Sequence, residues 1–309
     1  MKICASCHKD LPKASYSKKQ WKLDEYQRRC KVCVTNNREV QPIPKQEDTN
    51  EIFKTLDSVC LKDAEISDEE LFKQPPSQYE DCPICFLLLP SLDMGRKYYS
   101  CCGKRICNGC SYAVKKTKKT AISLCPFCRA PTHTSEEEAN EREKKRMEAG
   151  DADAIRNLGV YYRDGKYGFR QDHAKAFKLF VRAAKLGHAG ACANIGYAYR
   201  NGQGVEVDRK KGEYYYEQAA MRGNNIARYN LGNDEFLTGN MDRAIKHFMI
   251  AVRGGDYVSL NAIKELHTKG HATKEDYTKA LRAYQEYLGE IKSPQRDTAA
   301  AARKNYRYY

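Results

Sequence analysis

From Asp151 onward, apolar and small residues recur with a period of about 36 positions. Each period opens on an alanine. A leucine or isoleucine comes four residues later and a glycine five residues later; the opening alanines are Ala154, Ala191 and Ala227. Each period closes on a glycine with an aromatic residue seven positions before it; these glycines are Gly187, Gly223 and Gly255. Small residues let paired helices approach, and glycine suits the left-handed turn after a helix. The pattern therefore predicts a solenoid of helix–turn–helix units.

The periodic region extends beyond these three units. A degenerate fourth unit covers residues 256–291, where Ile263, Ala280 and Tyr284 keep the spacing, and we expect it to cap the stack. The full repeat region is predicted over residues 151–291. Residues 292–309 form a basic tail containing tyrosines, which we expect to be a last short helix or a frayed end.

Two polar stretches precede the repeats. Residues 134–150 begin with acids and end with bases, which complements a helix dipole and predicts a charged connecting helix. Residues 41–78 are rich in Asp and Glu, with apolar positions at helical spacing from Ile52 to Val59. This stretch is predicted to be an acidic linker with one amphipathic helix and a short turn at Asp68–Phe72.

Length and composition limit the class of protein. A chain of 309 residues predicts two or three domains. No stretch has the roughly 20 consecutive apolar residues that a membrane span needs, and nothing near Met1 resembles a signal peptide. We therefore expect an intracellular protein, cytoplasmic and/or nuclear, in a reducing setting that favours metal ligation over disulfides.

The formal net charge is +14. If twelve cysteines bind zinc as thiolates, three sites of about −2 each leave roughly +8. Some affinity for anionic partners follows, although a lysine-rich surface explains the charge equally well.

The chemistry of the chain is concentrated in its cysteines. Eight of the 14 lie in three clusters: Cys82 and Cys85; Cys101, Cys102, Cys107 and Cys110; and Cys125 and Cys128. Paired thiolates two residues apart can bind one tetrahedral zinc ion at about 2.3 Å. Eight such ligands predict two zinc ions.

The order of these pairs over residues 79–133 resembles the cross-braced RING finger. In that family the first and third pairs share one zinc ion, and the second and fourth pairs share the other. The resemblance assigns one ion to Cys82, Cys85, Cys107 and Cys110, and the second to Cys101, Cys102, Cys125 and Cys128. Lys104 stands where most members carry a histidine ligand, so the site resembles the all-cysteine variant, with His133 as a fallback ligand.

RING fingers recruit a ubiquitin-conjugating enzyme. The positions that match the family's contact surface are Ile84, Val114, Pro126 and Arg129, although Ile84 and Pro126 also suit zinc knuckles and Arg129 an ordinary surface. The resemblance implies an E3 ubiquitin ligase that acts by positioning a charged thioester, without a nucleophile of its own. Cys60 and Cys192 are interpreted as buried thiols.

A second zinc unit is expected over residues 1–40. Cys4, Cys7, Cys30 and Cys33 form two C-x2-C pairs that predict a third zinc ion, with a short helix between them. The pattern resembles a LIM-like domain of small-RNA silencing factors, which bridges argonaute and chromatin-modifying proteins. Its basic residues could equally contact phosphates or form a solvated face.

The periodic region resembles SEL-like repeats, relatives of tetratricopeptide repeats, through its A-x3-L-G-x2-Y pattern. Such arrays bind proteins or peptides on a concave face. The expected fold is therefore mostly α, with small cross-braced zinc domains followed by a helical solenoid.

Three functions fit these expectations. The first is an E3 ubiquitin ligase whose partners are a conjugating enzyme and a protein substrate or adaptor. The second is a non-catalytic scaffold, which Lys104, Val114 and the adjacent Cys101 and Cys102 favour. The third is nucleic-acid or chromatin-associated binding through the N-terminal zinc unit.

Overall fold

The computed structural model describes residues 2–3, 10–11, 66–73, 75, 80–91, 95–117 and 124–307. The chain divides into two compact units, Met1–Thr55 and Leu56–Tyr309. In the first unit, strands β1 (Lys2–Ile3) and β2 (Asp10–Leu11) pair antiparallel. Several predicted features lie outside the described residues: Cys4, Cys7, Cys30, Cys33, Cys60 and the helix expected over Ile52–Val59.

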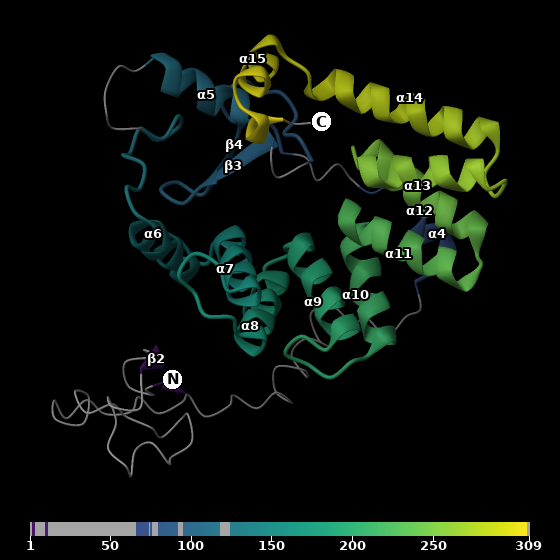
Figure 1. Cartoon of the computed structure of the whole chain (residues 1–309), viewed down its shortest axis with the longest axis horizontal. Helices are drawn as coiled ribbons and strands as arrows, with labels where there is room; N and C mark the ends of the chain where they lie inside the picture. Colours follow the sequence, from purple (N-terminus) through teal and green to yellow (C-terminus); the bar gives the residue numbers. More distant parts are fainter. Residues whose placement is uncertain are drawn as a thin grey trace. The chain divides into compact units, whose positions relative to one another are not determined.

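The second unit contains the predicted solenoid (Figure 1). Consecutive helices form pairs, and each pair also contacts the next. The pairs are α7 (Ala152–Asp164) with α8 (His173–Lys185), α9 (Ala189–Asn201) with α10 (Arg209–Met221), α11 (Asn225–Thr238) with α12 (Met241–Arg253), and α13 (Tyr257–Thr268) with α14 (Lys274–Ile291). The mostly helical fold class, with a repeat solenoid, is confirmed.

Glycine allows the close packing within the first three pairs. A Cβ placed on Gly159 would lie 2.6 Å from the ring of Phe180, which is too close for any side chain. The same contact recurs in each unit, in the pairs Gly159–Phe180, Gly196–Tyr216 and Gly232–Phe248. The aromatic residues that the repeat pattern singled out therefore fill the space that the missing side chains leave.

A small cysteine-rich module precedes the solenoid. Strands β3 (Arg96–Tyr99) and β4 (Lys104–Cys107) form an antiparallel hairpin, and helix α5 (Asn108–Thr117) follows directly. Leu89, Tyr99 and Ile106 form the apolar part of its core together with four buried cysteines. We refer to the described residues from Glu80 to Pro131 as the finger module.

Helix α6 (Glu136–Glu148) connects the finger module to the solenoid, where the charge pattern predicts a helix. Ser135 caps its first turn, with the amide of Glu138 donating to the hydroxyl over 3.2 Å. Glu143 is 6% exposed and accepts hydrogen bonds from Asn157 and Tyr161 of α7. The charged connector is therefore packed against the first repeat.

Short helices before the finger module and after the last repeat contact other parts of the second unit. Helix α4 (Asp68–Leu71) lies in the acidic linker and contacts α10. After α14, the tail forms helix α15 (Pro294–Ala302) and a 3-10 turn, η3 (Lys304–Tyr306), and α15 packs beside α5 of the finger module (Figure 1). None of the helices among the described residues combines the length and the hydropathy that crossing a bilayer requires.

Candidate metal centres

The eight cysteines of the finger module gather into two groups of four. One group contains Cys82, Cys85, Cys107 and Cys110, and the other contains Cys101, Cys102, Cys125 and Cys128. The sulfur atoms within each group all lie within 4.8 Å of one another. The structure thus brings together the same two interleaved sets that the RING resemblance implies.

The sulfur–sulfur distances suit a tetrahedral ion. Four thiolates about 2.3 Å from a zinc ion lie about 3.8 Å from one another, which is the edge of the tetrahedron. The sulfur–sulfur distances are 3.8 Å for Cys85–Cys107 and for Cys102–Cys125, and 3.5 Å for Cys101–Cys128. Both groups can therefore hold zinc without rearrangement of the backbone.

Electrostatics also favours a cation here. Burial raises the pKa of Cys102 to about 11 and raises the pKa of Cys101 as well. Neighbouring thiolates repel one another, so four of them are stable together only when a cation bonds to all four. In the first group, the amides of Cys107 and Cys110 donate to the sulfurs of Cys82 and Cys107 over 3.5 and 3.4 Å.

The adjacent Cys101 and Cys102 lie in the turn of the β3–β4 hairpin. The amides of Cys102 and Gly103 both donate to the carbonyl of Tyr99, over 3.1 and 2.8 Å. Gly103 has a φ of 69°, a left-handed conformation that favours glycine. This tight turn lets two consecutive cysteines join one group. Lys104 begins β4, and His133, the fallback ligand, lies outside both groups.

The two knuckles at the ends of the module have the same backbone design. After Cys85 the amide of Phe86 donates to the carbonyl of Cys82, and after Cys128 the amide of Arg129 donates to that of Cys125. Phe86 and Arg129 have φ values of 56° and 61°, which non-glycine residues seldom adopt. Both side chains are exposed, so each knuckle presents one large side chain to solvent.

The predicted conjugating-enzyme contacts differ in their accessibility. Arg129 is exposed, Ile84 and Val114 are half-buried, and Pro126 is buried. The larger exposed apolar side chains are neighbours of these residues: Phe86 is 77% exposed and Phe127 is 45% exposed. Sequence reasoning missed both phenylalanines, because their exposure depends on the turn geometry of the knuckles.

Arg296 of α15 reaches the first cysteine group from the far end of the chain. Its guanidinium is buried and donates to the carbonyls of Leu88 (2.7 Å) and Ile291 (2.6 Å), and more weakly to that of Leu87 (3.3 Å). Its Nη2 lies 3.8 Å from the sulfur of Cys85. A cation at this position offsets the net negative charge of a four-thiolate zinc site. No sequence motif marks Arg296, since 208 residues separate it from Leu88.

A second contact joins the finger module to the last repeats. The amide of Ser91 donates to the hydroxyl of Tyr287 over 2.7 Å, and its own hydroxyl donates to the carbonyl of Gly255. Gly255 has no room for a side chain, because a Cβ there would lie 2.2 Å from the ring of Tyr287. Leu88 packs with Tyr287 and Ile291 in a small apolar cluster.

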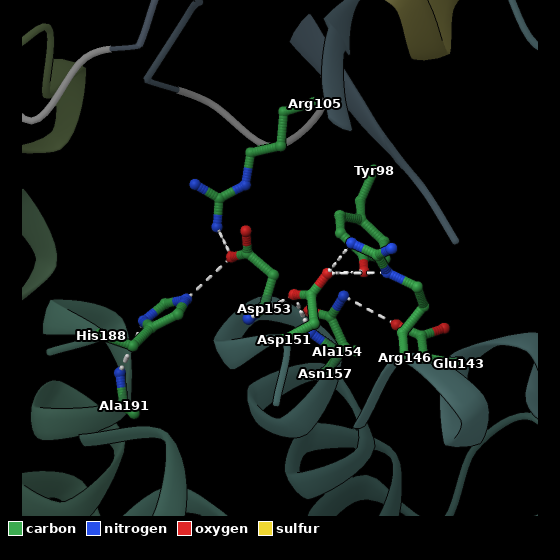
Figure 2. A network of polar contacts seen from close by, with 10 residues as sticks. All are labelled: Tyr98, Arg105, Glu143, Arg146, Asp151, Asp153, Ala154, Asn157, His188 and Ala191. Carbon is green, nitrogen blue, oxygen red and sulfur yellow. Dashed lines mark hydrogen bonds and ion pairs between the residues drawn. The ribbon is translucent and has the colours of Figure 1, made fainter. Parts of the chain in front are cut away.

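A polar network joins the β3–β4 hairpin to the first repeats (Figure 2). Tyr98 donates to the carboxylate of Asp151 over 2.9 Å, and Arg146 forms an ion pair with the same carboxylate at 2.7 Å. Burial and the hydrogen bond to Asp151 raise the pKa of Tyr98, which keeps it a neutral donor. Asp151 is also the N-cap of α7, so one carboxylate serves both modules.

The second half of this network centres on Asp153. It forms an ion pair with Arg105 of β4 and accepts a hydrogen bond from Nε2 of His188 over 2.9 Å. Burial opposes ionisation of Asp153, but His188 and Arg105 outweigh it and lower the pKa of the carboxyl. His188 caps α9 through its other ring nitrogen, so the hairpin is connected to two successive repeats.

The fold and these two groups together define a helical-repeat protein that carries a small cysteine-rich module. Residues 152–188 and 189–224 match the Sel1 repeat family, so the C-terminal region contains Sel1 repeats. This match covers the first two pairs of helices.

Curated proteins share shorter stretches with the chain. Over 57 residues it is 42% identical to "E3 ubiquitin-protein ligase GW2" of Oryza sativa subsp. indica, covering 18% of this chain and 12% of the relative. It is also 42% identical over 57 residues to "E3 ubiquitin-protein ligase DA2" of Arabidopsis thaliana, which covers 18% of this chain and 13% of that relative. Over 86 residues the chain is 36% identical to "ERAD-associated E3 ubiquitin-protein ligase component HRD3B" of Arabidopsis thaliana, covering 28% and 13%. The chain thus matches about an eighth of the length of each relative.

Solved structures with a similar arrangement include a Sel1 repeat protein from Oxalobacter formigenes. It is 26% identical with a TM-score of 0.42, over 54% of this chain and 64% of that one.

Proposed function

We propose that this protein is a RING-type E3 ubiquitin ligase. In this proposal the finger module binds two zinc ions and recruits a charged ubiquitin-conjugating enzyme, and the Sel1 repeats hold the substrate or a partner protein. The observation that carries the proposal is the interleaving of the two cysteine groups, because it ties both ends of one short segment into a single rigid platform. The E3 ligases among the relatives support it.

The proposed chemistry is positioning. Holding a pre-formed thioester beside an attacking lysine raises their effective concentration, which can supply several kcal/mol of the barrier. Cys192 is fully buried on α9, which removes it as a nucleophile. Zinc would be structural in both groups, since four protein ligands leave no open position for a substrate.

The contact surface in this proposal combines the two knuckles. Phe86 and Phe127 provide exposed apolar area beside the half-buried Ile84, and Arg129 provides a charged donor next to the last cysteine. Aromatic and arginine side chains dominate the binding energy of protein interfaces. This arrangement moves the apolar contact from Pro126, which is buried, to its neighbour Phe127.

The test is single-turnover discharge of ubiquitin from charged conjugating enzymes onto free lysine, with the full chain and a panel of enzymes. We expect acceleration by the wild type that Phe86→Ala and Arg129→Ala each reduce at least tenfold, the cost of one interface anchor. Leu237→Ala is the matched control, because Leu237 is 75% exposed on α11, in the third repeat. Zinc content is measured on every sample. No acceleration by a zinc-loaded wild type across the panel refutes the ligase proposal.

A non-catalytic scaffold is the second candidate. It is favoured by the small, half-buried Val114 at the position where many active RING fingers carry tryptophan. In that case the repeats and the finger module would both bind proteins. The predictions of nucleic-acid binding and of a third zinc ion both concern residues 1–40, most of which lie outside the described residues. A steep fall in affinity for nucleic acid with rising salt would support nucleic-acid binding.

A further inference from the structure

A short segment of the acidic linker lies against two helices of the repeats. Helix α4 precedes the finger module in the chain, yet it contacts α10, and its C-cap residue Phe72 contacts α12. We refer to the parts of α10 and α12 that this segment contacts as the α10–α12 surface. Leu71 is 2% exposed, although it belongs to a helix of only four residues. Since an isolated helix of this length does not form in water, its order comes from the surface on which it lies.

Basic side chains of α12 surround the end of α4. The ring of Phe72 lies 4.7 Å from the ring of His247, 5.2 Å from the guanidinium of Arg243 and 5.3 Å from the ammonium of Lys246. Arg243 also forms an ion pair with Asp68 at the start of α4. The segment is thus held by two apolar side chains and one carboxylate.

A buried cation lies behind His247, on the side away from Phe72. Arg228 of α11 is fully buried, with Nη1 3.4 Å from Nδ1 of His247, and its Nε and Nη2 have no hydrogen-bond partner among the described residues. The acidic residue that faces it is Glu217 of α10. Burial, and then Glu213, raise the pKa of Glu217 to about 7, so this carboxyl is only partly charged at neutral pH. Glu235 of α11 already pairs with Arg243, so Lys246 and the buried Arg228 are the further cations that attract an acidic ligand.

We propose that the α10–α12 surface recognises short acidic protein segments that end in Leu-Phe, and that Ser67–Phe72 is its built-in occupant. The sequence of this occupant, S-D-E-E-L-F, supplies the carboxylate that pairs with Arg243 and the two apolar side chains that pack on the surface. A partner segment of the same chemistry would displace α4 and bind in its place. The proposal thus gives a ligand class to the surface that α10 and α12, the second helices of two neighbouring units, form together. This ligand class does not depend on ligase activity.

The tether sets the size of the effect. A segment joined to its own site by a short linker has an effective concentration of about 1 mM. If the intrinsic dissociation constant is about 10 μM, the occupant lowers the apparent affinity for an added peptide about 100-fold. Releasing α4 from the α10–α12 surface should therefore restore this lost affinity, which is about 100-fold.

The experiment measures fluorescence anisotropy of a labelled peptide with the sequence of Ile66–Lys73 against the full chain. The double substitution Leu71→Ala and Phe72→Ala in the chain should tighten binding about 100-fold relative to wild type. Adding Arg243→Ala to this opened chain should reduce the gain about tenfold, because it removes the ion pair with Asp68 and the cation–π contact with Phe72. Adding Arg282→Ala, an exposed arginine of α14, should leave it unchanged. An opened chain that binds the peptide no better than wild type overturns the proposal and makes α4 a packing element only.

Hydrogen exchange on the wild type keeps the test decisive if the opened chain folds poorly. Saturating peptide should accelerate amide exchange in residues 67–73 while α10 and α12 keep their protection. Unchanged exchange in residues 67–73 at millimolar peptide refutes displacement. Neither readout involves ubiquitin transfer, so failure here and failure of the proposed ligase activity are separate results.

Discussion

Replacing Arg296 by methionine tests whether the C-terminal helix is part of the first metal centre. Arg296→Met keeps a long apolar side chain but removes the donors to Leu88 and Ile291 and the charge 3.8 Å from the sulfur of Cys85. Because Arg296 is 1% exposed, water cannot take over these hydrogen bonds without opening the contact between α15 and the finger module.

The size of the effect follows from these contacts. A hydrogen bond from a charged donor contributes about 1.5–3 kcal/mol, and a buried carbonyl left without a partner costs about 1–3 kcal/mol. The bonds to Leu88 and Leu87 join α15 to the finger module, whereas the bond to Ile291 stays within the C-terminal helices. One strong and one weak bond across the contact therefore contribute about 3 kcal/mol to docking of α15, roughly a 100-fold change in its equilibrium. Loss of a partner that hydrogen-bonds a metal ligand typically lowers metal affinity 10–100-fold.

The assay follows zinc release from the full chain into excess chelator with a chromogenic indicator. We expect Arg296→Met to accelerate release of one ion 10–100-fold and to leave the other ion at the wild-type rate. Arg303→Met is the matched control, because Arg303 follows α15 and is exposed. A folded Arg296→Met chain that releases both ions at wild-type rates refutes the reasoning.

Three further predictions follow from the fold. Gly232→Ala should destabilise the solenoid by about 1–3 kcal/mol, because the new Cβ would lie 2.6 Å from the ring of Phe248. Gly289→Ala, with open space around it, should stabilise the chain. The two midpoint temperatures of thermal unfolding test this difference. Burial, and then the neighbouring arginines, lower the pKa of His247 to about 3, so the folded state resists protonation and stability falls as the pH drops below the unfolded value near 6.5. Between pH 6.5 and 5 this group should cost about 2 kcal/mol, and His247→Gln should remove that part of the denaturant-measured pH slope. Cys82→Ser should remove one zinc ion per chain by elemental analysis, and unchanged zinc content would contradict the assignment of its group.

The solenoid could be predicted because its information is local. Each repeat places glycine and an aromatic residue at fixed spacing, so the pattern in the sequence is the packing contact itself, as in Gly159 with Phe180. The partition of the cysteines into two interleaved groups came instead from the resemblance to the RING finger, because each group joins pairs that lie more than 20 residues apart. Local sequence predicts the repeat contacts, and the resemblance supplies the longer-range pairing.

The remaining contacts could not be predicted, because they join distant segments. Nothing near Arg296 indicates that its guanidinium meets the carbonyl of Leu88, and nothing near Phe72 indicates the ring of His247. The exposure of Phe86 depends on a left-handed backbone that the knuckle imposes on a non-glycine residue. Tertiary packing decides these positions, and residue type alone does not reveal it.

The clasp formed by Arg296 has a consequence for how the protein is made. Translation proceeds at about 5–20 residues per second, so Arg296 leaves the ribosome roughly 10–40 s after Leu88, from which it is separated by 208 residues. Once Cys128 has been synthesised the nascent finger module has all eight cysteines, but Leu88 does not yet have Arg296 as its donor. The cysteine-rich module is thus completed by a helix that is synthesised after the repeats, and the finished metal centre marks a chain that has been translated through them.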